Sequence, residues 1–226
     1  TLPGNVAVAV HPDVDYVVVE RQHDGRSEKL ILAKSLIAAV FRDEEIKVLE
    51  TFKGRKLKGW QYHPLFTFVP PEKAAHFVVL GEFVTTEDGS GLVHMAPAFG
   101  AEDMDMASRH DLPVLMTVLP DGSFAPEVTP WRGMFIKNAD PLIVSDLRAR
   151  GLLFRTQAYT HSYPFCWRCH TPLMYYARDS WYIRTSRFKD RLVELNNTIN
   201  WVPQHVREGR FGNWLLSRKC VGSNPI

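Results

Sequence analysis

Short apolar runs rich in β-branched residues alternate with turn-forming residues along the first half of the chain. The runs VAVAV, DYVVVE and KLIL fall within residues 5–32, and residues 46–52, HFVVLGEFV, GLVHM and PVLMTVL follow. Runs of this kind, bounded by Gly, Asp and Pro, predict strands joined by tight turns. The pattern therefore predicts a β-rich core.

Three segments depart from this pattern and predict helices inserted among the strands. Residues 33–42 carry apolar side chains at near-helical spacing, and residues 101–109 and 141–150 are further candidates. The last of these has Pro141 near its expected start and Gly151 just past its expected end, as helix termini favour. The expected fold class is α+β.

Composition indicates the broad class of protein to which the chain belongs. The chain has 226 residues, of which 45% are hydrophobic, which is enough to bury a sizeable core. No apolar run approaches the roughly 18 residues of a membrane span, and three cysteines suit a reducing compartment better than a disulfide framework. We expect a cytoplasmic protein without a membrane partner. Because Thr1 leads almost directly into a strand with no starting methionine, we expect a piece of something longer.

The composition changes in the second half of the chain. Between residues 137 and 191 basic residues outnumber acidic ones by ten to four, and aromatic residues are interleaved with them. This mixture suits a nucleic-acid partner, because cations meet phosphate and rings stack on bases. It equally suits solvated cations around a buried aromatic cluster. We place the boundary between a core, residues 1–157, and a C-terminal aromatic and basic segment, residues 158–226, at this change.

The stretch GLVHMAPAFGAEDMD, residues 91–105, gathers the most polar chemistry. His94 ends a predicted strand, and Glu102, Asp103 and Asp105 fall in the first turns of a predicted helix. Acids there stabilise the positive end of a helix by about 0.3–1 kcal/mol each without any ligand, and His94 could simply be a core histidine. Asp103 alone is placed to point along the corner toward His94, where a carboxylate would suit an ammonium group.

Two further motifs could bind ligands. Cys166 and Cys169 form a C-x-x-C, which supplies two of the four ligands of a tetrahedral zinc; His161 and His170 lie nearby in the sequence. At the N-terminus, TLPGN offers the Thr1 hydroxyl and the Asn5 amide, which can hold a ligand or cap a turn.

Four segments, in order, resemble the connective editing domain of isoleucyl-tRNA synthetase, a class I aminoacyl-tRNA synthetase. They are TLPGNVAVAVHP, GLVHMAPAFGAED, SYPFCWRCHTPLMYYARDSWYI and INWVPQHVREGRFGNWL. The valyl and leucyl enzymes share the domain and its aspartate, but the last two segments look more like the isoleucine branch. The resemblance implies a β-barrel-like core with peripheral helices, inserted into the ATP-binding catalytic domain of a parent enzyme of protein biosynthesis.

The activity implied is proofreading: hydrolysis of the ester that joins a wrong amino acid, chiefly valine, to the 3′ adenosine of isoleucine tRNA. One methylene gives only about 1–3 kcal/mol of discrimination, and isoleucine against valine is itself the standard example of this limit. The resemblance implies that Asp103 binds the α-ammonium and that His94 excludes isoleucine and helps to orient water, making these two the catalytic pair. Thr1 and Asn5 match residues that line the site.

The resemblance also sets expectations about cofactors and partners. Editing needs no cofactor, and the partners are the aminoacylated 3′ end of tRNA and the parent catalytic domain. A structural zinc at Cys166 and Cys169 would, in the family, share an upstream C-x-x-C that this chain lacks. The adenylate signatures H-I-G-H and K-M-S-K-S do not occur, so we expect no aminoacylation by this chain alone.

Two departures leave alternatives open. The family's threonine-rich peptide is represented only by its last threonine, Thr1, and the tail after GRFGNWL looks compressed. The alternatives are a non-catalytic tRNA-docking or structural fragment and an editing domain of the valyl or leucyl type.

Overall fold

The computed structural model describes residues 1–23, 25–42, 44–157, 162–181 and 184–216. The chain divides into two compact units, Thr1–Ala177 and Arg178–Ile226. The boundary predicted after residue 157 falls beside residues 158–161, which lie outside the described residues; residues 162–177 belong to the first unit.

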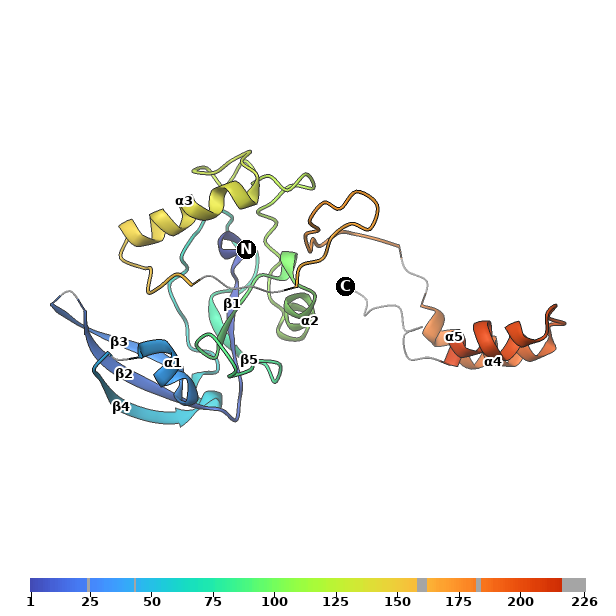
Figure 1. Ribbon diagram of the computed structural model, residues 1–226, viewed down its shortest axis with the longest axis horizontal. Helices are drawn as coiled ribbons and strands as arrows, with labels where there is room; N and C mark the ends of the chain where they lie inside the picture. Colours follow the sequence, from blue (N-terminus) through green and yellow to red (C-terminus); the bar gives the residue numbers. More distant parts are fainter. Residues whose placement is uncertain (24, 43, 158–161, 182–183, 217–226) are drawn as a thin grey trace. The chain divides into compact units, whose positions relative to one another are not determined.

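The first sheet of unit 1, called sheet A, has the strand order β5-β1-β6. Its central strand β1 (Ala7–Val10) pairs in parallel with β5 (Phe77–Leu80) and antiparallel with β6 (Leu92–Met95). Small and apolar side chains of β1 and β6 pack against helix α2 (Ala101–His110), which lies beside β1 in Figure 1. This apolar layer holds α2, through Met106 and Ala107, against the sheet whose strand β6 bears His94.

The second sheet, called sheet B, is an antiparallel set with the order β3-β2-β4. It consists of β2 (Asp15–His23), β3 (Arg26–Ala33) and β4 (Ile46–Lys53). The short helices η2 (Lys34–Leu36) and α1 (Ile37–Phe41) cover one face, where their apolar side chains pack against those of all three strands. Figure 1 shows α1 lying across this sheet.

A third apolar cluster lies around α3 (Ile136–Ala149). Ala139, Ile143 and Leu147 repeat at helical spacing on its buried face and pack with Trp131 and Phe124. Three short 3-10 helices connect the layers: η1 (Leu2–Gly4), η3 (Gly54–Leu57) and η4 (Pro97–Phe99). The helix η1 leads the chain into β1, and η4 leads it from β6 to α2.

The prediction of an α+β fold is confirmed. The expected core is β-barrel-like. The described strands form two open three-stranded sheets and do not close into a barrel. Two element predictions are wrong. Residues 113–119 form no named strand although burial alternates from Pro113 to Thr117, because the segment pairs with a neighbour only through the isolated bridge between Val118 and Phe124. Helix α3 begins at Ile136, so that Pro141 lies inside it; the burial of Ala139 ahead of the proline favours the earlier start.

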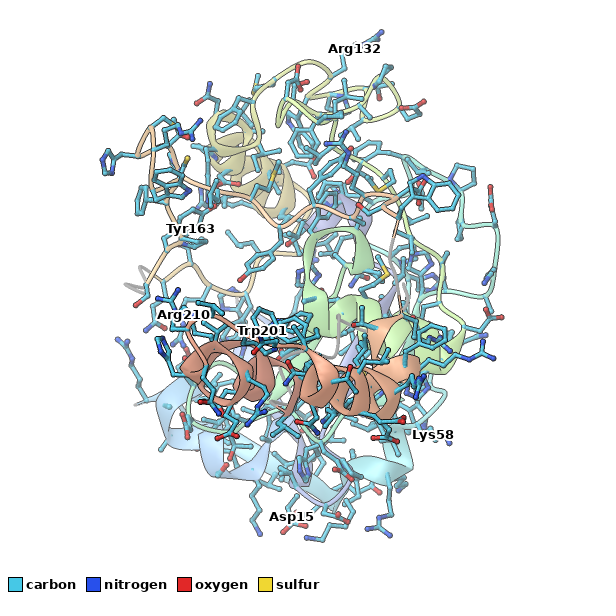
Figure 2. The ribbon with its side chains drawn as sticks, turned by 90° about the vertical axis from the view of Figure 1, so that its right-hand side faces the viewer. Asp15, Lys58, Arg132, Tyr163, Trp201 and Arg210 are labelled. Atoms are coloured by element: carbon cyan, nitrogen blue, oxygen red, sulfur yellow. The ribbon has the colours of Figure 1, made fainter. Side chains whose placement is uncertain are left out.

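Unit 2 is helical in its described part. It comprises η5 (Thr185–Phe188), α4 (Lys189–Thr198), the π-helix η6 (Val206–Gly212) and α5 (Asn213–Leu216). The buried Asn196 donates to the Arg207 carbonyl and accepts from the Trp201 indole, both at 2.9 Å. Trp201 also packs on Phe211, with ring centroids 5.5 Å apart, and Figure 2 shows it on this unit together with Arg210. No helix in the described part of the chain is long and apolar enough to cross a membrane.

Candidate functional site

Polar side chains from separate segments meet at one end of sheet A. Because β6 runs antiparallel and β5 parallel to β1, the start of β1, the start of β5 and the end of β6 share that end. Val8 pairs with His94, and the Val6 amide donates to the Met95 carbonyl at 2.9 Å. The topology therefore places the segment from Thr1 to Asn5 beside His94 and the turn that follows it.

Three of the predicted site residues share hydrogen bonds there. The Thr1 Oγ1 lies 2.9 Å from His94 Nε2, and the Asn5 Nδ2 lies 3.4 Å from His94 Nδ1. Asn5 Nδ2 also donates to the Ala7 carbonyl at 2.9 Å and faces the Met95 carbonyl at 3.4 Å. The structure thus brings Thr1, Asn5 and His94 into one cluster.

The electrostatics of His94 favour a neutral ring. Burial is the main reason why the pKa of His94 falls to about 4. At pH 7 the imidazole is therefore uncharged, and both ring nitrogens already have a partner, Thr1 on one side and Asn5 on the other. Such a ring offers a ligand a rigid surface and a fixed dipole. In this arrangement neither ring nitrogen is free to take a proton.

Asp103 lies in the first turn of α2, just beyond the same strand end. It is the third residue of α2, and its Oδ2 accepts a hydrogen bond from the Ala96 amide at 2.9 Å. Burial raises the pKa of Asp103, and the Ala96 hydrogen bond opposes that rise. A Cβ on Gly100 would lie only 2.9 Å from the Asp103 Cγ and Oδ2, so glycine leaves room for the carboxylate to fold back against the turn.

The neighbouring acids are arranged differently. Glu102 is exposed, and Asp105 forms an ion pair with Arg109 at 2.6 Å, one helical turn away. A surface cleft on this outer side of α2 contains none of the predicted site residues; it is lined by Pro12, Leu80, Gly81, Glu82, Phe83, Ala101, Glu102, Asp105, Met106, Arg109 and His110. Asp103 alone among the three acids faces the end of sheet A.

Sequence reasoning missed two members of the cluster, Tyr62 and His76. The Tyr62 hydroxyl donates to Asn5 Oδ1 at 2.5 Å, and His76 Nε2 lies 3.2 Å from the Asn5 carbonyl oxygen. Both residues lie outside the strands, Tyr62 in the irregular segment after η3 and His76 immediately before β5. No periodicity marks them, and only the pairing of β5 with β1 brings them to Asn5.

The Cys166 and Cys169 pair lies on a turn closed by two backbone hydrogen bonds, from His170 to the Cys166 carbonyl and from Cys166 to the Thr171 carbonyl. A hydrogen bond from the Thr171 side chain, 3.0 Å from the sulfur, is the main reason why the pKa of the exposed Cys169 falls to about 7. Within the described residues no three potential ligands gather, so the two thiols fit half of a tetrahedral zinc site. His161, the other ligand considered, is outside the described residues.

Comparison with known proteins places this geometry in a family. The family model of class I tRNA synthetases (I, L, M and V) matches residues 13–220. The chain belongs to this family. It is 51% identical over 233 residues to the isoleucine–tRNA ligase of Thermobifida fusca (strain YX) and 45% identical to that of Clostridium acetobutylicum. Both matches cover 100% of this chain but only 22% of the relative's length.

Solved structures show the same fold. The structure GlLeuRS-CP1 superposes with a TM-score of 0.53 at 12% identity, covering 70% of this chain and 80% of its own. The editing domain of the P. knowlesi cytosolic leucyl-tRNA synthetase gives 0.51 at 14% identity, covering 78% and 80%. Class I synthetase membership and the fold of connective domains are thus established for this chain.

Proposed function

We propose that this chain is the editing domain of an isoleucine–tRNA ligase and hydrolyses the ester between a small misattached amino acid, chiefly valine, and the 3′ adenosine of isoleucine tRNA. The observation that carries the proposal is the juxtaposition at the end of sheet A. A partly buried carboxylate, Asp103, lies one turn beyond a neutral, fully hydrogen-bonded histidine, His94. Family membership supports the same conclusion.

Asp103 is suited to bind the α-ammonium of the aminoacyl group. Its Oδ2 is held by the Ala96 amide, and Oδ1 accepts no hydrogen bond from the described residues. Since burial disfavours the carboxylate form, a cationic ligand would relieve that cost as well as add a charge-assisted hydrogen bond. An ammonium group is the chemical feature that every aminoacyl ester shares, so Asp103 would anchor the substrate without selecting its side chain.

His94 is suited to select the side chain by size. A neutral ring with both nitrogens engaged can be neither displaced cheaply nor charged at pH 7. A wall of this kind would exclude a side chain one methylene larger than valine. Water attack would then be favoured by position and by hydrogen bonds from groups around the ester, with the ribose hydroxyl of the terminal adenosine as a further donor.

The test is deacylation of valyl- and isoleucyl-charged isoleucine tRNA by the domain. We expect valyl-tRNA to be cleared and isoleucyl-tRNA to be spared. The isosteric change Asp103→Asn should lower the rate of valine release by roughly 100-fold, corresponding to about 3 kcal/mol for a lost ionic hydrogen bond. The neighbouring Glu102→Gln, which removes an exposed charge from the same helical turn, is the matched control and should leave the rate unchanged.

Other outcomes point to the alternatives. Equal inertness toward both charged tRNAs, in a folded protein, would contradict hydrolysis and favour a tRNA-docking fragment. Clearance of charged valine or leucine tRNA instead would indicate a valyl or leucyl type of domain. If His94→Ala still spared isoleucyl-tRNA, the size filter would have to lie elsewhere.

A further inference from the structure

We propose that Tyr62 is a positioning residue that acts through Asn5 to keep the ring proton of His94 on Nε2. Proton placement is a property of the folded domain, whereas its consequence for hydrolysis rests on the proposed function. Tyr62 lies on an irregular segment far from both residues in sequence, and it reaches Asn5 because the start of β5 lies beside the start of β1.

The orientation of the Asn5 amide follows from its neighbours. Its nitrogen faces the carbonyl oxygens of Ala7 at 2.9 Å and Met95 at 3.4 Å, and carbonyl oxygens can only accept. Its oxygen faces the Tyr62 hydroxyl at 2.5 Å. The reverse amide orientation would set oxygen against two carbonyl oxygens, so the NH2 group must be the one that faces His94.

This orientation assigns the tautomer of His94. Asn5 Nδ2 can only donate: one of its two hydrogens serves the Ala7 carbonyl, and the other lies between the Met95 carbonyl and His94 Nδ1, both 3.4 Å away, so the contact with the ring suits an unprotonated, accepting Nδ1. A neutral imidazole then carries its proton on Nε2, which donates to Thr1 Oγ1 at 2.9 Å. The Thr1 hydroxyl accepts from His94 and keeps its own proton available to a ligand.

Tyr62 is needed because the contact from Asn5 to His94 is long. At 3.4 Å it constrains the amide less than the 2.5 Å contact from Tyr62 on the opposite side. Burial also raises the pKa of Tyr62, which keeps its hydroxyl protonated and therefore a donor. Without that donor the Asn5 oxygen would lose its partner, and the amide could turn away from the ring.

Tyr62 is itself held in place by His76. The Tyr62 amide donates to the His76 carbonyl at 3.0 Å, and the two rings meet edge to face with centroids 5.9 Å apart. His76 has a φ of 63°, an uncommon conformation for a residue with a side chain, and its amide donates to the Val6 carbonyl at 2.6 Å. Backbone and ring contacts thus fix the point at which the Tyr62 hydroxyl meets Asn5.

The assignment makes a directional prediction for substitution. In Tyr62→Phe the hydroxyl is lost while the ring is kept, so Asn5 is released and the Nδ1-protonated form of His94 becomes populated. In that form Nε2 is an acceptor, and the Thr1 hydroxyl must donate to it instead of to a ligand. Asn5→Ala removes the donor altogether and should shift the tautomer at least as far.

Nitrogen-15 NMR of the histidine side chains at pH 7 reads the tautomer directly. We expect the Nε2–H form for His94 in the parent protein and a growing share of the Nδ1–H form in Tyr62→Phe and Asn5→Ala. Tyr176→Phe is the matched control, because Tyr176 is also half-buried but donates to the Val118 carbonyl; it should leave His94 unchanged. A parent His94 protonated on Nδ1, or a Tyr62→Phe protein with the parent tautomer, would overturn the proposal.

Kinetics with valyl-charged isoleucine tRNA separates this inference from the proposed function. Tyr62→Phe should lower kcat about tenfold with little change in KM, because it alters the direction of a proton and not the ammonium anchor at Asp103. A tautomer shift with unchanged kcat would reject the positioning role in hydrolysis. If the parent domain does not hydrolyse the ester at all, the proposed function fails, and the NMR result still decides the assignment of the proton.

Discussion

The two sheets of unit 1 have the same number of strands, but their polar side chains differ in the interactions that they form. In sheet B the exposed charged residues form ion pairs at the surface, such as Lys53 with Asp15 at 2.8 Å, and Asp15 points outward from the end of the sheet in Figure 2. At the end of sheet A, Asn5, Tyr62 and His94 form hydrogen bonds among neutral groups that are partly buried.

The contrast shows which of the two regions holds its polar groups in fixed directions, as a chemical site requires. Exposed ion pairs contribute at most about 1 kcal/mol each and tolerate many geometries. Neutral donors and acceptors removed from water must be matched in direction, because an unpaired one costs about 1–3 kcal/mol. The polar side chains at the end of sheet A are therefore held in defined directions. The Asp103 Oδ1 beside them accepts no hydrogen bond from the described residues. That combination distinguishes a candidate site from a stable surface.

The largest effect that we expect from this contrast is in the pH dependence of stability. The pKa of His94 is lowered from 6.5 to about 4, so between these values the unfolded chain binds a proton that the folded chain does not. Stability should fall as the pH falls from 6.5 to 4, by about 1–3 kcal/mol for this half-buried ring.

Urea unfolding at pH 7 and pH 4.5 measures this dependence, with His94→Gln and the exposed His63→Gln compared. His94→Gln cannot titrate and should flatten the dependence, whereas His63→Gln leaves His94 in place and serves as the control. Identical slopes in all three proteins would show that His94 is not the group responsible.

A smaller effect, on stability alone, is expected at the one buried charge of sheet B. Arg21 is only 6% exposed, contacts Glu28, donates to Glu44 at 2.7 Å and lies 4.4 Å from the Phe154 ring. Arg21→Ala should lower the free energy of unfolding by about 2 kcal/mol, mostly through lost packing and cation–π contact, since both glutamates remain hydrated.

The same variant should clear valyl-tRNA at the parent rate per folded molecule, because sheet B supplies nothing to the site. Arg21→Lys should recover part of the stability. Loss of clearance by a well-folded Arg21→Ala protein would show that sheet B takes part in the function.

Next in size is the effect of filling the space beside Asp103. In Gly100→Ala the new Cβ would meet the carboxylate at 2.9 Å and push it from its position, and we expect clearance to fall about tenfold. The φ of −149° suits alanine, so stability should change by less than about 1 kcal/mol. Gly209→Ala, where a Cβ meets nothing within 4 Å, is the matched control for deacylation rates. Parent-like clearance by Gly100→Ala would indicate that the position of Asp103 is not critical.

Local pattern was enough to predict much of this fold. The strand expected at residues 46–52 is β4, Ile46–Lys53, and the helix expected at 101–109 is α2, Ala101–His110. Both are short elements whose own apolar spacing and flanking turn residues specify them. The expectation that Asp103 points toward the strand end also depended only on helix geometry, and the hydrogen bond to Ala96 has that direction.

The remainder depended on contacts distant in sequence. Tyr62 and His76 gain their meaning from the parallel pairing of β1 with β5, which no short segment encodes. Residues 113–119 resemble a strand in composition, but a strand also requires a partner edge, and Val118 alone forms an isolated bridge, with Phe124. The roles of His94 and Asp103 came from a family resemblance and await the deacylation experiment.

The smallest effect is expected where an ion pair of unit 1 is fully exposed. Arg55 and Asp13 contact each other but are 65% and 63% exposed, so solvent screens their attraction and competes for both groups. Arg55→Ala should change the free energy of unfolding by less than about 0.5 kcal/mol and leave valyl-tRNA clearance unchanged. A double-mutant cycle with Asp13→Ala, measured by urea unfolding at low and high salt, isolates the pair. A coupling energy comparable to the loss in Arg21→Ala would mean that exposure does not separate this surface pair from the buried charge of sheet B, and the contrast with sheet A would then rest on His94 and Asp103 alone.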